Sequence, residues 1–275
     1  MTPDPRITLA RPDLAARSLE GQLAAGTYGD PQAMTVVAPA TALRASDNPQ
    51  AEQWDQLLFG ETFDVLETAG EVCWGQARRD GYVGFVARQD LAPLAPAPTH
   101  RVSTLRTYGF AQPNIKSRAL GPYPLNALVS VEARQDRFAK VANGGWMVIE
   151  HLAPIGTIET DFVAVAERFL GAPYLWGGRD GLGVDCSGLV QQALLACGRA
   201  CPRDTDQQAQ MGVPVETLQR GDLVFWRGHV GILLDPETLL HANGHHMAVI
   251  IEPLAEAIRR IGATKTGAPT GYRRL

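Results

Sequence analysis

A repeat with a period of about 60 residues constrains the fold of this chain more than any other feature of its sequence. Three pairs of short strings carry the repeat, namely Leu91–Pro93 with Leu152–Pro154, Gly84-Phe85 with Gly145-Trp146, and Thr41–Arg44 with Ser103–Arg106. Every pair has an offset of 61 or 62 residues, and three weak matches at one offset indicate a tandem repeat. A unit of about 60 residues is the size of a small β-barrel.

Short apolar runs separated by turn signals predict that both repeats are all-β. Three of these runs are candidate strands: Met34–Val37, Thr62–Leu66 and Val83–Val86. We expect a first β unit over residues 35–95 and a second over residues 99–155, joined by a short Pro-rich linker. Residues 1–34 are predicted to form an arm that packs on the first unit and contains one short helix from about Leu14 to Gly26.

The last part of the chain follows a different pattern. Apolar residues at helical spacing predict one helix over residues 162–170 and another over 186–197, with a Gly-rich loop, 171–183, between them. Short β-like runs come next, and a further helical segment spans residues 253–261. We therefore expect an α+β domain over residues 156–275.

Composition and charge exclude several classes of partner. The chain has 25 Lys and Arg residues against 29 Asp and Glu residues, which gives a net charge of −4. A mildly acidic chain lacks the excess positive charge that attracts nucleic acid or an anionic membrane. No window approaches the roughly 18 apolar residues of a membrane helix, and charges at Asp4, Arg6 and Arg11 interrupt any N-terminal secretion signal. We expect a cytoplasmic protein with no nucleic-acid partner and no membrane partner, whose oligomeric state is open.

The predicted helix over residues 186–197 begins with Cys186, in a position that favours a nucleophile. Unpaired N–H groups and the helix dipole lower the pKa of a thiol at a helix start. His229 at the entry to an apolar strand, and His241 twelve residues later, complete a pattern typical of thiol hydrolases. His229 would take the thiol proton, and His241 would orient its ring. From the residues alone, a cysteine packed under the helix and ordinary histidines remain alternatives.

The other cysteines and histidines are not expected to hold a metal or a disulfide framework. Cys197 and Cys201 lie four residues apart, without a second Cys/His pair at zinc-site spacing. His241, His245 and His246 lie close in sequence, but a predicted Asn-Gly turn would separate their side chains. We therefore predict no metal and no cofactor.

Six strings in the last domain resemble the NlpC/P60 family of cysteine peptidases. In the order that the family has them, they are Pro173–Gly178, Asp185–Val190, Pro202–Thr205, Arg220–Phe225, His229–Ile232 and His241-Ala242. The resemblance covers residues 160–255 or so and implies a papain-like fold in which Cys186 is the nucleophile, His229 the general base and His241 the orienting residue. Family members cleave peptidoglycan stem peptides, typically between D-γ-glutamate and a diamino acid.

The resemblance also implies substrate-binding roles for residues beside the nucleophile. Tyr174 would donate a hydrogen bond to the oxyanion or to the substrate, while the backbone N–H of Cys186 is a natural oxyanion donor at the helix start. In relatives that act on free peptides, an acidic residue equivalent to Asp185 helps to bind the N-terminal ammonium group of the substrate. Ser187 flanks the nucleophile on its other side. A helix cap is an equally open interpretation of Asp185.

The two β units resemble bacterial SH3-like domains, the first through Gly60-Glu61 and Gly81–Val86, the second less closely. The expected fold is multidomain, with two small all-β SH3-like barrels followed by an α+β papain-like NlpC/P60 domain. This layout is similar to that of muropeptide-recycling endopeptidases. In those enzymes, the first SH3-like domain supplies an acidic residue and a tyrosine around an N-terminal L-alanine. By position, the candidates here are Glu61 and Tyr82.

The expected function is therefore cysteine peptidase activity on free murein peptides, at the bond between γ-D-glutamate and the diamino acid in L-Ala-γ-D-Glu-diamino acid. Two alternatives stay open. One is a thiol amidase or acyltransferase that acts on another substrate, because related folds perform such chemistry. The other is a binding protein whose SH3-like units tether a weak or inactive domain to wall peptides. The complete set of Cys186, His229 and His241 argues against the binding protein.

Overall fold

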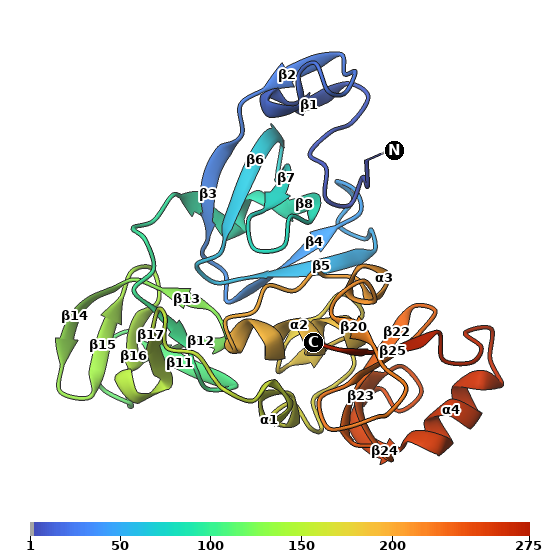
Figure 1. The fold of residues 1–275 in the computed structure, drawn as a ribbon. Helices are drawn as coiled ribbons and strands as arrows, with labels where there is room; N and C mark the ends of the chain where they lie inside the picture. Colours follow the sequence, from blue (N-terminus) through green and yellow to red (C-terminus); the bar gives the residue numbers. More distant parts are fainter. Residues whose placement is uncertain (1–2) are drawn as a thin grey trace. The chain divides into compact units, whose positions relative to one another are not determined.

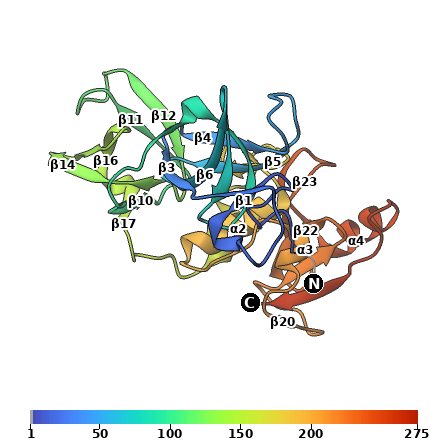
Figure 2. The same ribbon diagram turned by 90° about the horizontal axis from the view of Figure 1, so that it is seen from above.

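The structure, a computed structural model, describes residues 3–275 of the chain. It divides into two compact units, an N-terminal unit that ends at Ile155 and a C-terminal unit from Gly156 to Leu275 (Figures 1 and 2). Within residues 3–275, no helix is long and apolar enough to cross a membrane.

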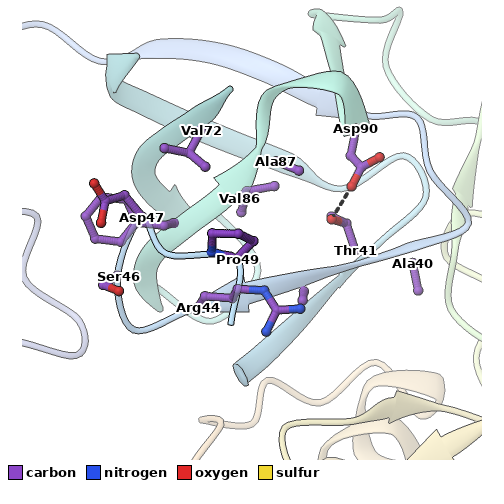
Figure 3. Close-up of a pocket in the computed structure, with 12 residues that line it drawn as sticks. Ala40, Thr41, Arg44, Ser46, Asp47, Pro49, Val72, Val86, Ala87 and Asp90 are labelled. Carbon is purple, nitrogen blue, oxygen red and sulfur yellow. Dashed lines mark hydrogen bonds between the residues drawn. The ribbon is translucent and has the colours of Figure 1, made fainter. Parts of the chain in front are cut away.

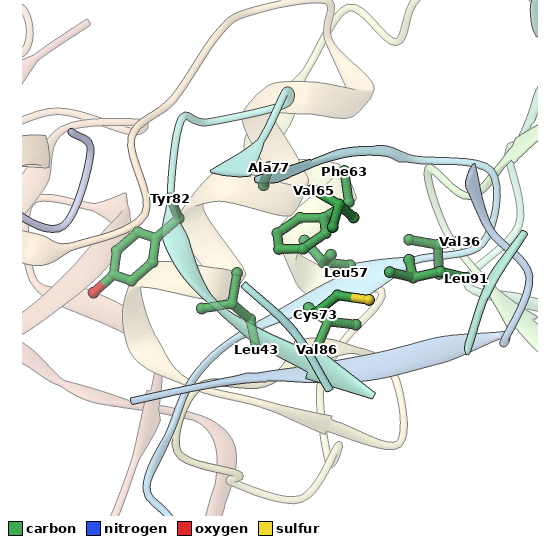
Figure 4. Close-up of a cluster of buried hydrophobic side chains, with 10 residues drawn as sticks. All are labelled: Val36, Leu43, Leu57, Phe63, Val65, Cys73, Ala77, Tyr82, Val86 and Leu91. Carbon is green, nitrogen blue, oxygen red and sulfur yellow. The ribbon is translucent and has the colours of Figure 1, made fainter. Parts of the chain in front are cut away.

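The first β unit is a seven-stranded antiparallel sheet with the strand order β5-β4-β8-β7-β6-β3-β9. Its strands are β3 (Gln32–Val36), β4 (Ala40–Arg44), β5 (Gln53–Leu58), β6 (Thr62–Ala69), β7 (Val72–Ala77), β8 (Val83–Ala87) and β9 (Leu91–Pro93). Because successive side chains of a strand point to opposite faces, alternate residues enter a common core. Val36, Leu43, Leu57 and Phe63 lie in this core and are fully buried (Figure 4).

The second β unit consists of two smaller sheets, with the strand orders β12-β11-β16-β15-β14 and β13-β10-β17. Its strands are β10 (His100–Val102), β11 (Arg106–Phe110), β12 (Ala119–Pro124), β13 (Leu128–Val129), β14 (Val131–Gln135), β15 (Phe138–Val141), β16 (Gly145–Val148) and β17 (Leu152–Pro154). Phe59 of the first β unit enters the core between them, and its ring meets that of Tyr123 edge-on, with centroids 4.8 Å apart. The two β units therefore share part of a core.

Two of the three sequence matches fall on equivalent strands of the two β units. Leu91–Pro93 forms β9 and Leu152–Pro154 forms β17, and a single 3-10 turn precedes each strand. Phe85 in β8 and Trp146 in β16 also correspond, because each pairs with the strand that follows the opening strand of its unit.

The third match, of Thr41–Arg44 with Ser103–Arg106, is wrong, because the two strings do not occupy equivalent positions in the two β units. Arg44 of β4 pairs with Phe85, whereas the residue that pairs with Trp146 is Phe110 of β11. The structural counterpart of Arg44 is therefore Phe110, 66 residues later, and not Arg106. The likeness of Thr41–Arg44 to the later string is a coincidence of composition.

The offset changes along the chain because one connection is longer in the first β unit. Cys73 of β7 pairs with Val86 of β8, thirteen residues away, whereas Ala139 of β15 pairs with Met147 of β16, eight residues away. The first β unit thus has five more residues between these strands. The longer connection includes Arg78–Tyr82 and so carries one of the two predicted specificity residues.

The N-terminal arm is extended, and the helix predicted there is wrong. Strand β1 (Leu14–Ala16) runs parallel to β2 (Thr27–Gly29), and only one 3-10 turn, η1 (Arg17–Leu19), lies between them. Tertiary packing overrides the local apolar spacing, because Ala16 enters a buried cluster with Trp74 of the first β unit. The arm thus packs on that unit, while residues 1 and 2 lie outside the described residues.

The C-terminal unit combines a six-stranded antiparallel sheet, in the order β20-β25-β21-β22-β23-β24, with four helices among its described residues. The helices are α1 (Phe162–Glu167), α2 (Cys186–Ala196), α3 (Thr205–Gln208) and α4 (Leu254–Gly262). The strands are β18 (Arg179–Asp180) and β19 (Gly183–Val184), which pair with each other, then β20 (Val213–Pro214), β21 (Leu223–Trp226), β22 (His229–Asp235), β23 (Thr238–Asn243), β24 (Ala248–Pro253) and β25 (Gly271–Arg274). Helix α2 is almost entirely buried and packs on β22 and β23.

A cavity of about 250 Å³ lies in the first β unit (Figure 3). It is lined by β4, by the end of β8 and by the turn that contains Asp47 and Pro49. The hydroxyl of Thr41 donates a 2.5 Å hydrogen bond to the carboxylate of Asp90 at its rim. This bond ties the 3-10 turn of Asp90 to β4.

Gly75 in β7 is a position where the sheet leaves no room for a side chain. A Cβ atom there would lie 2.2 Å from the backbone oxygen of Asp64 in the neighbouring strand β6. We expect Gly75→Ala to lower the free energy of unfolding of the N-terminal unit by roughly 1–3 kcal/mol, because overpacking forces the backbone to shift. Gly262→Ala is the control, since a Cβ there meets no atom within 4 Å. Urea unfolding of both variants checks this, and a wild-type midpoint for Gly75→Ala would contradict it.

Candidate active site

Cys186 is the first residue of α2, and Asp185 caps the helix. The Asp185 carboxylate accepts a 2.7 Å hydrogen bond from the backbone N–H of Gly188, which is the usual role of an N-cap residue. The thiol is buried, with 5% of the residue exposed. Backbone N–H groups of Ser187 and Val230 hydrogen-bond its sulfur. Because Val230 follows His229 in β22, this contact brings the start of β22 to the start of α2.

Burial, rather than the helix start, dominates the pKa of the thiol. The pKa of Cys186 is raised to about 12, chiefly by removal of the thiol from water and in smaller part by the charge of Asp185. The two backbone hydrogen bonds and the guanidinium of Arg203 act in the opposite direction but are outweighed. The lowered pKa expected from the helix start is therefore wrong for the protein without substrate. A neutral thiol needs a neighbouring base to become a nucleophile.

His229 opens β22 and His241 lies in the adjacent strand β23. Nε2 of His229 lies 2.8 Å from Nδ1 of His241, which is hydrogen-bonding distance, and the two ring centroids are 5.0 Å apart. Since Nε2 faces His241, the ring nitrogen left for the thiol of Cys186 is Nδ1. The structure thus joins the two histidines by a hydrogen bond, and the backbone N–H of Val230 brings the residue next to His229 to the sulfur of Cys186. Their joint catalytic role stays a prediction.

Both histidines are poised as neutral rings. The pKa of His229 is lowered to about 3, chiefly by burial, while His241 and Arg260 act in the same direction. Burial likewise lowers the pKa of His241 to about 3, with Arg260 contributing. A neutral imidazole beside a neutral thiol is the form in which the imidazole can accept the thiol proton.

Glu252 and Asn243 are polar contacts of His241 that the sequence analysis missed. Nε2 of His241 lies 2.7 Å from a carboxylate oxygen of Glu252 in β24 and 3.0 Å from the side-chain nitrogen of Asn243. The two-residue period of side chains along a β-strand is the signal that could have identified Glu252 and Asn243. Asn243 is two residues beyond His241, and Ile250, directly opposite His241, is two residues before Glu252. All of these side chains therefore share one face of the sheet.

Asp185 is held by groups of the C-terminal unit. Arg203, only 1% exposed, forms a two-pronged ion pair with it at 2.6 and 3.0 Å. The backbone N–H of Gly177 donates to the same carboxylate at 2.8 Å, and the hydroxyl of Ser187 at 3.2 Å. The structure thus gives Asp185 the helix-cap role and pairs it with a cation of its own chain. Binding of substrate by Asp185 and Ser187 stays a prediction.

Tyr174 lies near the thiol. Burial raises the pKa of its hydroxyl, and the charges of Cys186 and Asp185 raise it further. The hydroxyl therefore remains a hydrogen-bond donor. The backbone N–H of Tyr174 donates a 2.9 Å bond to Met247, which fixes this loop to the connection between β23 and β24.

Glu61 and Tyr82 lie in the N-terminal unit. Glu61 is 1% exposed, forms an ion pair with Arg79 and accepts a 3.1 Å hydrogen bond from the backbone N–H of Leu58. Glu61 is therefore a buried, paired carboxylate and not a solvent-facing charge of a strand. Tyr82 is also buried, and Figure 4 shows its hydroxyl pointing away from the apolar core on which its ring packs. Their approach to Cys186 stays a prediction.

His246 has its own partner near the predicted turn. Its backbone N–H and Nδ1 both lie within 3.0 Å of the side-chain oxygen of Asn243. Within residues 3–275, no group of three His, Cys, Asp or Glu side chains is arranged to hold a metal ion.

The chain matches two known domain families. The NlpC/P60 family matches residues 171–261, and a family described as bacterial dipeptidyl-peptidase Sh3 domain matches residues 43–91. The first match contains Cys186, His229 and His241, and the second contains Glu61 and Tyr82.

Two curated relatives carry the same name. The chain is 30% identical over 229 residues to the gamma-D-glutamyl-L-lysine dipeptidyl-peptidase of Bacillus subtilis, and the match covers 74% of this chain and 76% of that protein. The protein of that name from Bacillus cereus is 36% identical over 104 residues, which cover 34% of this chain and 31% of that protein.

Two solved structures share the fold. An NlpC/P60 family protein from Bacillus cereus has a TM-score of 0.73 at 21% identity, over 88% of this chain and 99% of that one. An NlpC/P60 endopeptidase from Photobacterium damselae subsp. piscicida has a TM-score of 0.59 at 14% identity, over 88% of this chain and 71% of that one. At these identities the likeness concerns the fold alone.

The ion pair of Asp185 with Arg203 should matter for stability as well as for the site. We expect Arg203→Gln to lower the free energy of unfolding of the C-terminal unit by about 3–5 kcal/mol, because it strands a buried carboxylate. Arg220→Gln is the matched control. Its ion pair with Asp161 has both side chains more than 40% exposed, so the expected loss is below about 1 kcal/mol. Hydrogen exchange of α2 in urea measures both, and equal losses would contradict the prediction.

Proposed function

This chain belongs to the NlpC/P60 family, and from that premise we propose that it is a cysteine peptidase acting on free murein peptides. The scissile bond is the one between γ-D-glutamate and the diamino acid in L-Ala-γ-D-Glu-diamino acid. One observation carries the proposal: the thiol of Cys186 at a helix start, beside the hydrogen-bonded rings of His229 and His241. The name of the Bacillus subtilis relative supports the choice of the γ-D-glutamyl bond.

The reaction follows from the protonation states of the site. Nδ1 of His229 takes the proton of the Cys186 thiol, and the sulfur attacks the γ-carbonyl carbon of the glutamyl residue. The backbone N–H of Cys186 and the hydroxyl of Tyr174 donate to the resulting oxyanion. The C–N bond then breaks while His229 protonates the leaving amine. Water, deprotonated by His229, hydrolyses the thioester, releases L-Ala-γ-D-Glu and restores the thiol.

Selection for short peptides rests on the N-terminal unit in this proposal. Glu61 and Tyr82 of the first β unit, together with Asp185, would recognise the free ammonium of L-Ala. The partners of Glu61 and Asp185 within the chain, Arg79 and Arg203, mean that the ammonium joins existing ion pairs rather than meeting bare carboxylates. An enzyme with this preference serves the recycling of released wall peptides, which we place in the cytoplasm.

We also propose two features of the fold. The second β unit is an SH3-like barrel, because its strands repeat those of the first β unit, with one shorter connection. The C-terminal unit has a papain-like arrangement. The support is that a buried helix carrying the thiol packs on an antiparallel sheet that carries both histidines.

Replacement of the thiol tests whether the chain is an enzyme of this class. Cys186→Ala removes the nucleophile, so kcat for release of L-Ala-γ-D-Glu should fall at least about 10³-fold. Cys197→Ala, at the other end of the same helix, is the control and should keep its activity. The assay is chromatography of the released products. Unchanged turnover in Cys186→Ala would rule out the thiol mechanism.

A blocked substrate tests the recognition of the N-terminus. The expected result is that L-Ala-γ-D-Glu-diaminopimelate is cleaved at least about tenfold faster, as kcat/KM, than its N-acetylated form, because acetylation removes the charge that the carboxylates recognise. Equal rates would contradict ammonium recognition by Glu61 and Asp185. No cleavage of either peptide would contradict the murein substrate and favour a thiol amidase or acyltransferase.

A further inference from the structure

A line of polar contacts continues from the two histidines to the far edge of the sheet. His229 contacts His241, and the second nitrogen of His241 contacts the carboxylate of Glu252 at 2.7 Å. Arg260 of α4 forms an ion pair with the same carboxylate. His241 is fully buried and only 10% of the Glu252 side chain is exposed, so solvent screens these interactions weakly.

The contacts determine which nitrogen of His241 carries the hydrogen. A carboxylate paired with Arg260 can only accept hydrogen bonds, so Nε2 of His241 must donate to Glu252. The side chain of Asn243 also turns its nitrogen to Nε2, at 3.0 Å, because its oxygen accepts from the backbone N–H of His246. One ring nitrogen cannot donate and accept at once. The shorter, charge-assisted contact to Glu252 prevails.

The hydrogen on Nε2 of His241 also decides the tautomer of His229. With its hydrogen on Nε2, neutral His241 presents a lone pair at Nδ1, and this lone pair accepts from Nε2–H of His229. His229 consequently presents a lone pair at Nδ1, the nitrogen that must receive the thiol proton. In the opposite tautomer of His241, the lone pair of His229 would point at His241, and a hydrogen would face Cys186.

We propose that Glu252, held by Arg260, is a positioning residue that sets the tautomers of His241 and His229 and thereby turns the basic nitrogen of His229 to the thiol. The inference rests on the proposed peptidase function of this site and extends it to residues in β24 and α4. Glu252 has a second effect through its charge. When His229 holds the thiol proton, the carboxylate stabilises the positive charge across His241.

The charges around His229 predict opposite effects for Glu252 and Arg260. Glu252 raises the pKa of His229, whereas Arg260 lowers it. The charged or titratable groups that act on the two rings are Asp185 at the start of α2, His241 in β23, His246 in the following turn, Glu252 in β24 and Arg260 in α4. If Glu252 and Arg260 only held the sheet together, there would be no reason for their replacement to shift the pKa of His229 in opposite directions.

The experiment compares Glu252→Gln and Arg260→Gln with Glu256→Gln and Arg259→Gln, two changes of the same kind in the first and last turns of α4. In Glu252→Gln we expect kcat to fall about ten- to a hundredfold, with KM changed less than about twofold, because part of the general-base contribution is lost. The acid limb of the kcat/KM pH profile should move to lower pH, since the pKa of His229 falls. In Arg260→Gln it should move to higher pH. The two controls should match the wild type.

Nitrogen-15 NMR of the histidine rings provides a readout that needs no turnover. In the wild-type protein near neutral pH, we expect hydrogen on Nε2 and none on Nδ1 for both His229 and His241. Glu252→Gln should show a mixture of tautomers. Hydrogen on Nδ1 of His229 in the wild type, or unmoved acid limbs in both variants, would overturn the inference. Failure of the wild type to cleave murein peptides, with the expected tautomers in place, would instead contradict the proposed function alone.

Discussion

The buried carboxylate of Asp185 connects three segments that would otherwise be independent. It caps α2 through Gly188, binds the preceding loop through the N–H of Gly177, and pairs with Arg203 in the segment after the helix. Burying a charge costs free energy that no single contact offsets, and each of these contacts compensates part of that cost. The position of Cys186 depends on this network, because the first residue of a helix goes where its cap is held.

Burial around the thiol has two opposing consequences for reactivity. It excludes water, which strengthens every interaction inside the site, but it also suppresses charge on Cys186, His229 and His241. In the resting site the thiol and both imidazole rings are therefore neutral. Reactivity must then come from a proton transfer that the surroundings favour, rather than from a thiolate already formed. The hydrogen-bonded histidines, backed by Glu252, fit that requirement, because they give the arriving proton a defined destination.

The N-terminal unit illustrates how a duplication diverges. The two β units remain joined closely: the backbone N–H of Leu128 donates to the oxygen of Phe59, and Gly60 lies so near Leu128 that no Cβ fits. Away from this junction, the units differ where β7 connects to β8, and the longer connection carries Tyr82. Connections between strands tolerate added residues better than the strands themselves, so such places are where specificity can be acquired.

The sequence by itself determined the classes of element, the β-rich first half, and the residues of the thiol and histidine pattern. These features depend on local periodicity and on motifs whose members lie close together in the chain. The N-terminal arm and the Thr41–Arg44 match were predicted wrongly. Packing against Trp74 selects an extended arm, and strand pairing rather than likeness of letters defines which residues correspond.

Only the tertiary structure decided the electrostatics of the site. Nothing in the string around Asp185 shows that Arg203 lies against its carboxylate, or that burial outweighs the helix start for the pKa of Cys186. Glu252 reaches His241 because β23 and β24 pair in one register, which shorter or longer turns would alter. Periodicity along a chain predicts which face a side chain occupies. The charges and the amount of water that it meets there depend on segments far away in sequence.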